Sequence, residues 1–209
     1  MAILPLVIAP DPRLKTKSEP VARIDDEIRT LAADMFDTMY AERGIGLAAV
    51  QVGVLKRLLV ADVTWRDEEG PGKQHALVNP EIVQPSEELN VYKEGCLSFP
   101  EQFADVTRPK SVRVRYLDLQ GKQHEEDFDG LLATCVQHEI DHLNGIVFVD
   151  HISTLKRDMI IRKLNKMKKQ GYFDPHDHRH CGHDHSHDHE QEHVHGPHCN
   201  HADDHDHLL

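Results

Sequence analysis

Two histidines and a glutamate in the C-terminal half of the chain form the pattern His-Glu-x-x-His, which is typical of metal-dependent hydrolases. His138 and His142 are four residues apart, and Glu139 follows the first of them. In an α-helix, with about 3.6 residues per turn, these imidazoles lie on one face and can bind one divalent ion. Glu139 can then accept a proton from water without being a ligand. The alternative is a pair of polar side chains on a half-buried face, with no metal.

The third metal ligand has to come from another part of the chain, because a catalytic site of this kind usually has three protein ligands. Downstream, Asp150 and His151 follow too soon, where the helix should already have ended. Upstream, Cys96 lies in the segment Glu94-Gly95-Cys96-Leu97-Ser98. The glycine allows close backbone approach, and a thiolate is a strong ligand for zinc or iron. Cys96 is the better candidate, although an isolated strand cysteine can also be a small buried hydrophobe.

A third unusual segment is Gly44-Ile45-Gly46-Leu47-Ala48-Ala49-Val50-Gln51. Its glycines permit conformations that expose backbone donors and acceptors, and the amide of Gln51 can donate a hydrogen bond. It falls short of a dinucleotide-binding or P-loop pattern. On its own it can also be a loop packed closely against a helix.

The elements that must position these residues predict an α+β fold, in which antiparallel or mixed sheets pack around a central helix that carries His138 to His142, with N-terminal and C-terminal helices. Asp25 or Asp26 can cap a first helix that ends before Gly44, and the central helix is expected from Asp129 to about Asn144, with Gly145 ending it. β-rich runs separated by Gly, Pro and acidic turns predict antiparallel strands at Arg57 to Asp62, Ala76 to Val83, Glu87 to Tyr92 and Val112 to Asp118.

Composition divides the 209 residues into a catalytic domain, residues 1–173, and a disordered metal-binding tail, residues 174–209. The tail has 13 of the 18 histidines and a net charge of −8, against −4 for residues 1–173. Its imidazoles can bind several transition-metal ions, and our hypothesis is that it buffers metal near the active site or protects that site when metal is scarce. The alternative is an acidic solvated tail that binds metal only in vitro.

A last helix, about Thr154 to Gln170, carries seven basic residues against one acid. Its basic face can meet ribosomal RNA or another polyanion, or it can be a solvated face. No apolar run reaches the ~18 residues that cross a bilayer, and Met1 to Pro10 lacks a basic leader and a cleavage pattern. We therefore expect a cytoplasmic protein with no membrane partner. Cys96 and Cys135 are expected to be reduced.

Taken together and in this order, Gly44 to Gln51, Glu94 to Ser98 and His138 to His142 resemble the three signature motifs of peptide deformylases. The resemblance covers about residues 1 to 170. It extends to the start Pro5 to Leu14 and to Asn79-Pro80, Phe99-Pro100-Glu101 and Gly130-Leu131-Leu132.

The resemblance implies a substrate, an N-formylmethionyl nascent peptide, and a role for each site residue. Cys96, His138 and His142 bind the metal, and Glu139 carries the proton from water to the departing amine. The Gln51 amide and the backbone N–H of Leu97 stabilise charge on the formyl oxygen. Residues that bind the rest of the substrate are also implied: Ile45, Leu131 and Cys135 for the methionine side chain, and Ile45, Gly46 and Gly95 for the peptide backbone.

The implied metal is Fe²⁺, one per chain, with Zn²⁺, Ni²⁺ or Co²⁺ as possible substitutes. The sequence departs from some bacterial members in having Phe103 in place of arginine and Thr134 in place of isoleucine, which leaves preference beyond methionine open.

Two alternative functions remain. A zinc-dependent peptidase would use Glu139 on internal amide bonds but gives Cys96 no role. A metal-storage protein or metallochaperone would make the histidine-rich tail the main function and the domain a carrier.

Overall fold

The chain folds around one central helix enclosed by two sheets. The computed structural model describes residues 2–65 and 72–173. Three α-helices are described: α1 (Asp26–Ala41), α2 (Gly130–Leu143) and α3 (Thr154–Lys169). The strands are β1 (Gly46–Ala48), β2 (Leu58–Ala61), β3 (His75–Pro85), β4 (Leu89–Cys96), β5 (Phe99–Pro109), β6 (Ser111–Leu117) and β7 (Gln123–Asp129).

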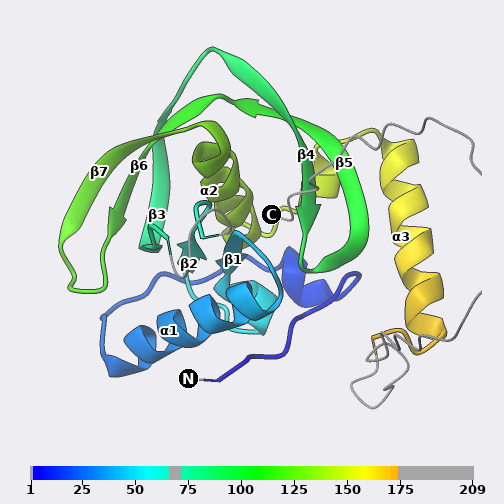
Figure 1. The fold of residues 1–209 in the computed structure, drawn as a ribbon, viewed down its shortest axis with the longest axis horizontal. Coiled ribbons are helices and arrows are strands. Elements are labelled where there is room, and N and C mark those ends of the chain that lie inside the picture. The colour runs from blue at the N-terminus through cyan, green and yellow to red at the C-terminus, as the bar shows by residue number, and fades with distance from the viewer. Residues whose placement is uncertain (1, 66–71, 174–209) are drawn as a thin grey trace, which may run out of the picture.

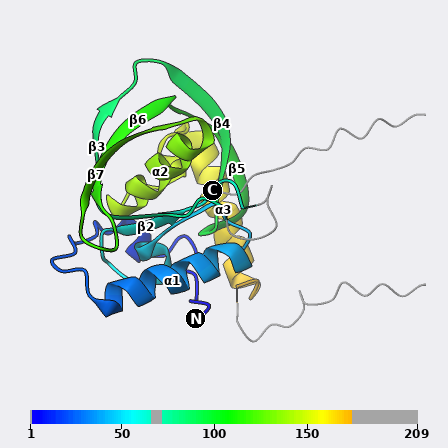
Figure 2. The ribbon, with the colours of Figure 1, turned by 60° about the vertical axis from the view of Figure 1, so that its left-hand side comes forward.

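The strands form an antiparallel five-stranded sheet of order β1-β2-β3-β6-β7 and a separate β4–β5 hairpin. Figure 1 shows α2 between the larger sheet and this hairpin, with α1 on the side of β1 and β2, and α3 beside β5. The view in Figure 2 keeps α2 inside the curve of β3, β6 and β7. The predicted α+β fold with a central helix is confirmed.

The apolar residues of α2 explain its position. Val136, Ile140 and Leu143 are buried in one hydrophobic cluster with β-strand residues such as Val112 and Val114. A second cluster joins α1 to β2, and a third joins α3 to the hairpin. Because α2 is covered on its sheet side and carries ten buried residues, its side chains have little freedom to move.

The ends of the helices agree with their sequence signals. The Asp25 carboxylate accepts a hydrogen bond from the N–H of Ile28 at 3.3 Å and caps α1. Gly145, at φ +75°, follows the end of α2 in the left-handed conformation that favours glycine. None of the helices in residues 2–65 and 72–173 is long and apolar enough to cross a bilayer.

The four expected strands correspond to β2, β3, β4 and β6, but β4 begins two residues later than expected and continues to Cys96. Strands β1, β5 and β7 were not predicted. The expected tail, residues 174–209, lies outside the described residues.

Candidate metal centre

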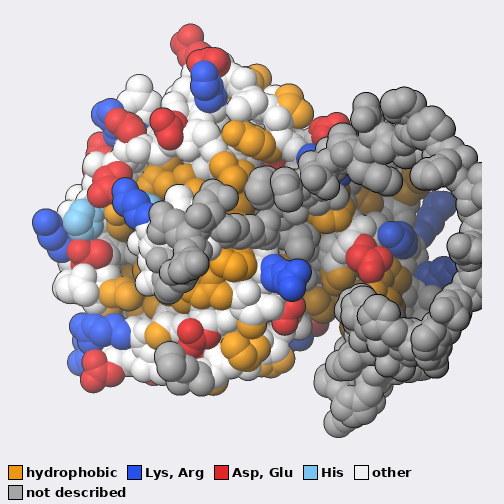
Figure 3. Space-filling view, in the orientation of Figure 1, with side chains coloured by type: hydrophobic (Ala, Val, Ile, Leu, Met, Phe, Trp, Pro, Cys, Tyr) orange, Lys and Arg blue, Asp and Glu red, His pale blue; other side chains and the backbone are white. Residues whose placement is uncertain are grey.

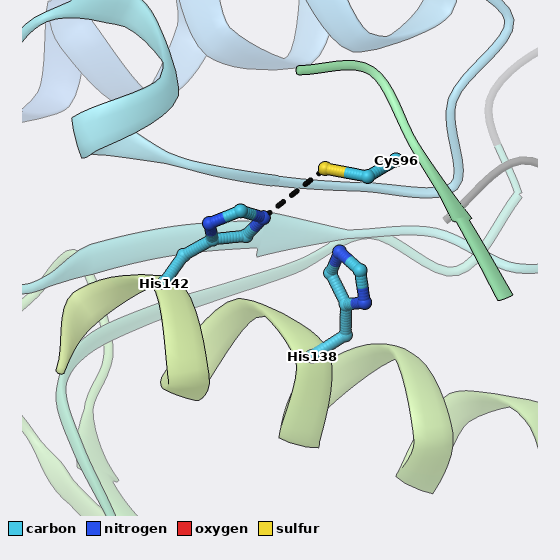
Figure 4. Close-up of side chains that lie close together, drawn as sticks. All are labelled: Cys96, His138 and His142. Atoms are coloured by element: carbon cyan, nitrogen blue, oxygen red, sulfur yellow. Dashed lines mark hydrogen bonds between the residues drawn. The ribbon is translucent and has the colours of Figure 1, made fainter. Parts of the chain in front are cut away.

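Three potential ligand atoms meet at the end of the β4–β5 hairpin. One ligand atom each from Cys96, His138 and His142 lies within 4.8 Å of the others, and all three residues are buried. The Cys96 Sγ is 3.2 Å from the His142 Nε2. Figure 4 shows both imidazoles rising from the same side of α2 toward the sulfur. Residues more than 40 positions apart in the sequence are thus brought to one point.

The chain reaches this point because β4 ends in an irregular turn. The register of β4 and β5 shifts between Glu94 and Cys96, and Cys96 then pairs with Phe99 across Leu97 and Ser98. This irregularity turns the end of β4 toward α2. His138 and His142 lie on one face of α2 because they are four residues apart. Gly95 lies at this shift and is buried.

The donor atoms fit a transition-metal ion. His138 Nδ1 is engaged with Glu94, while His138 Nε2 and both Glu139 oxygens are buried without a hydrogen-bond partner among the described residues. Buried polar atoms are normally satisfied, so these mark a place for a ligand. One sulfur and two imidazole nitrogens suit zinc or iron(II).

A network of buried charges holds the His138 ring. Glu94 accepts a hydrogen bond from His138 Nδ1 at 2.9 Å and two from Arg108, at 2.5 Å and 3.1 Å. Arg108 also donates to Asp141 at 2.7 Å. Burial alone would raise the pKa of Glu94, but the hydrogen bonds from His138 and Arg108 outweigh it and keep the pKa below its usual range. Glu94 therefore remains a carboxylate that fixes the ring orientation of His138.

Glu139 is suited to proton transfer. Its carboxyl group is fully buried, and this burial raises its pKa to about 7, although the neighbouring His138 opposes the shift. A carboxyl group with a pKa near neutrality can both accept and donate a proton at physiological pH. A Cβ added at Gly46 would lie 2.6 Å from Glu139 Oε1 and 2.5 Å from Cys135 Sγ. The absence of a side chain at Gly46 therefore leaves space for the Glu139 carboxyl group.

Gln51 and Leu97 both adjoin the sulfur. The Gln51 side-chain nitrogen lies 3.4 Å from Cys96 Sγ and 3.4 Å from Ser98 Oγ, and its oxygen accepts a 2.7 Å hydrogen bond from the N–H of Ala48. The Ala48 N–H can only donate, so its hydrogen bond fixes the Gln51 oxygen there and leaves the amide nitrogen facing the centre. Leu97 follows Cys96 at the turn of the hairpin.

The three residues expected to contact methionine belong to one apolar cluster. Ile45 and Cys135 are buried in it with Ala61, and Leu131 packs against it. The Cys135 thiol donates to the Ile45 carbonyl at 3.3 Å, and burial raises the pKa of this thiol well above its usual range. The cluster lies beside the metal centre because Cys135 is one helical turn before His138.

Two residues that the sequence did not indicate join the same cluster, Val63 and Trp65. The indole N–H of Trp65 donates to the carbonyl of Gly44 at 2.8 Å. Trp65 therefore holds the backbone at the start of the Gly44 to Gln51 segment. A tryptophan in the turn that follows β2 gives no sign of this contact, because its partner is a backbone group 21 residues away.

The two departures from the family pattern lie in different places. Phe103 is on β5, partly buried, with the ammonium group of Lys93 over its ring at 5.4 Å. Thr134 is buried in α2, and its hydroxyl donates to the carbonyl of Gly130 at 3.3 Å. Neither side chain contributes an atom to the three-residue cluster of ligands.

Comparison of this chain with known sequences points to a single protein family. The sequence model of the family described as polypeptide deformylase matches residues 3–158. A peptide deformylase of Rhizorhabdus wittichii is 57% identical over 172 residues, which cover 81% of this chain and 97% of the relative. One of Rhodopseudomonas palustris is 55% identical over 171 residues, covering 82% and 98%.

Solved structures give the same result. A peptide deformylase of Ehrlichia chaffeensis superposes with a TM-score of 0.76 at 44% identity, covering 82% of this chain and 99% of the other. A structure of the enzyme from that organism in complex with actinonin has a TM-score of 0.76 at 46% identity, covering 81% and 99%. With a family match over most of its length and relatives this similar, the chain belongs to the polypeptide deformylase family.

Proposed function

We propose that Cys96, His138 and His142 form the metal centre at which this chain hydrolyses the formyl amide of N-terminal formylmethionine in newly synthesised proteins, releasing formate. The observation that carries the proposal is the meeting of the three ligand atoms within 4.8 Å, in a chain of this family. The peptidase and metal-storage alternatives find no support in the relatives, which are named peptide deformylases.

The residues around the centre divide the chemistry. A divalent ion held by the three ligands supplies Lewis-acid polarisation and makes a water molecule more acidic. Glu139 takes the proton of the attacking water and delivers it to the amine nitrogen as the C–N bond breaks. Formate and a free N-terminal amine are the products. The Gln51 side-chain amide and the Leu97 backbone N–H stabilise the negative charge that grows on the formyl oxygen.

The substrate peptide lies along β1. This strand is at the edge of the five-stranded sheet, so a peptide can pair with it as an added strand, held by the backbone of Ile45 and Gly46 on one side and of Gly95 on the other. The methionine side chain enters the apolar cluster of Ile45, Leu131 and Cys135, beside Val63 and Trp65. Apolar contacts in this cluster select an uncharged, apolar side chain such as that of methionine.

The ion is Fe²⁺, with Zn²⁺, Ni²⁺ or Co²⁺ as possible substitutes. The thiolate and the two imidazoles accept all four ions, so ligand chemistry alone does not choose among them. Metal analysis of protein purified without oxygen identifies the ion, and a preparation that is fully active with zinc alone would contradict iron.

The first prediction tests the reaction itself. Protein purified without oxygen should release one formate per formyl-Met-Ala-Ser consumed. Glu139→Gln should retain the metal and lose nearly all turnover, because the amide cannot accept the proton of water. Formate release is measured beside the metal content of the same sample. Cleavage of unformylated peptides, or an active Glu139→Gln protein, would contradict the proposal.

We propose that residues 1–173 form the catalytic domain. The remaining proposals concern the histidine-rich segment, residues 174–209, the location of the protein, and helix α3. Residues 174–209 are proposed to bind additional transition-metal ions through their 13 histidines. Since the substrate is a nascent chain, we place the protein in the cytoplasm.

Helix α3 is the proposed contact with the ribosome. Figure 3 shows basic side chains along this helix. Six of its basic residues are exposed: Lys156, Arg162, Lys163, Lys166, Lys168 and Lys169. Such a surface attracts ribosomal RNA in a salt-dependent way. Replacing Lys163 and Lys166 by glutamate should weaken sedimentation with ribosomes at low salt, and unchanged cosedimentation would exclude the contact.

A further inference from the structure

A continuous series of hydrogen bonds runs from the surface to the metal ligand His138. It begins at His151, whose Nε2 donates to Asp141 Oδ2 at 2.7 Å. Arg108 donates to the same Asp141 oxygen at 2.7 Å and to both oxygens of Glu94. Glu94 in turn accepts from His138 Nδ1. The series links His138 to a residue 13 positions further along the sequence.

Exposure rises steadily along this series. The side chain of Glu94 is fully buried, those of Arg108 and Asp141 are 6% and 18% exposed, and that of His151 is 34% exposed. One fully buried carboxylate and one partly exposed carboxylate therefore share one guanidinium group. His151 is the most exposed member, and it is the second donor to the Asp141 oxygen that Arg108 also contacts.

The geometry of Arg108 couples the two carboxylates. A guanidinium group is planar and its N–H donors point in fixed directions. Its Nε and Nη2 are engaged by Glu94, while Nη1 is engaged by Asp141. A displacement of Asp141 therefore rotates the whole group and changes the position of Glu94. Because Glu94 sets the ring orientation of His138, that displacement reaches the metal.

We propose that Asp141 and His151 are positioning residues for the metal ligand His138, with His151 holding Asp141 in place to receive Arg108. The inference rests on the proposed role of His138 as a ligand. The four residues come from different parts of the fold: Glu94 from β4, Arg108 from β5, Asp141 from α2, and His151 from the end of the 3₁₀ helix Phe148–Asp150. The series thus ties the hairpin to the helix at the metal centre.

A second histidine–aspartate pair supplies a matched control. His124 Nε2 donates to Asp118 at 2.7 Å, and its side chain is 24% exposed. This pair belongs to β7 and the β6–β7 turn, and Asp118 otherwise accepts from backbone N–H groups of that turn. Loss of the His124 pair removes a similar surface interaction without touching the series that leads to His138.

The test uses the full chain loaded with Co²⁺, whose absorption spectrum reports the geometry of its ligands. The variants are His151→Ala, His151→Gln, which restores an N–H donor, and the control His124→Ala. The rate of cobalt transfer to a chelator, the cobalt spectrum and the melting temperature are measured for each. We expect His151→Ala to lose cobalt about fivefold faster, a smaller effect than the ~10–100-fold loss of metal affinity typical when a direct hydrogen-bond partner of a ligand is removed. Its spectrum should shift, and His151→Gln should restore both properties.

The proposal is overturned if His151→Ala keeps the wild-type spectrum and cobalt-loss rate, or if His124→Ala changes them equally. It is also overturned if His151→Gln behaves like His151→Ala, because the hydrogen bond is then not responsible. A fall in melting temperature common to both alanine variants, with only His151→Ala losing cobalt faster, supports a positioning role. Formate release by the wild-type protein is assayed separately, so failure of the proposed reaction is distinguished from failure of this inference.

Discussion

Gly46 has no room for even a methyl group, and the side chains around it belong to the candidate site. A Cβ there would lie 2.5 Å from Cys135 Sγ and 2.6 Å from Glu139 Oε1. Real Cβ atoms do not approach this closely, so one of these side chains must move. The second prediction follows from this geometry.

Gly46→Ala should destabilise the protein by about 1–3 kcal/mol, as overpacking of a tight interior does. It should also lower kcat/KM by about 100-fold, since displacement of a catalytic group by an ångström has effects of that size. Urea unfolding and formate release measure the two. The control is Gly121→Ala, where nothing lies within 4 Å of the new Cβ and only the φ of +83° is unfavourable. Full activity in Gly46→Ala would show that Glu139 does not need this space.

At this scale, the sequence predicts the residues of the centre better than the residues that support them. The spacing of His138 and His142 predicts a shared helical face, and the motif order suggests Cys96 as their partner. Nothing in the sequence links Arg108 to Glu94, Asp141 or His151, because an isolated arginine is normally a solvated surface charge. Its burial depends on tertiary contacts between β5 and α2.

At the scale of the elements, the strands that the sequence did not predict, such as β5 and β7, lack an alternating apolar pattern. Strand β7 has one buried residue, Phe128, and lies at the edge of its sheet. Its polar residues pair with those of β6, as Arg113 does with Asp127. Strand β5 points Gln102 and Arg108 inward along with Phe99 and Val106, so its buried face is partly polar. Strands β2, β3 and β6 were easier to predict because their buried residues, such as Leu59, Leu77 and Val114, are aliphatic.

His75, the first residue of β3, gives the third prediction. Its ring packs edge-on against Phe128 of β7 at 5.6 Å, and burial lowers its pKa below the usual value. The folded state therefore disfavours the protonated ring. This residue's stabilising contribution is complete above about pH 6.5, the unfolded pKa, and is lost as the pH falls toward the folded pKa.

The melting temperature of the wild-type protein should accordingly fall more between about pH 7.5 and pH 5.5 than that of His75→Phe, which packs without titrating. The comparison between the two proteins removes the contribution of other groups. Parallel pH curves would show that His75 is not responsible.

At the scale of the whole molecule, the composition of the last 36 residues sets them apart from residues 1–173. If the tail buffers metal, deleting residues 174–209 should leave formate release unchanged when metal is abundant. The truncated protein should bind fewer metal ions per chain and lose activity sooner under a chelator, because a local reserve is gone. Metal stoichiometry and activity decay are measured for both proteins. Equal survival of the two would remove the buffering role.

The arrangement of the two sheets around α2 has a mechanical consequence. One candidate ligand belongs to the β4–β5 hairpin, while the other two belong to the helix packed on the larger sheet. An ion bound by all three is a cross-link between two separate sheets, comparable in its effect to a disulfide that joins distant parts of a chain. Loading with metal should then restrain opening of the hairpin away from α2, so the catalytic ion would also stabilise the fold.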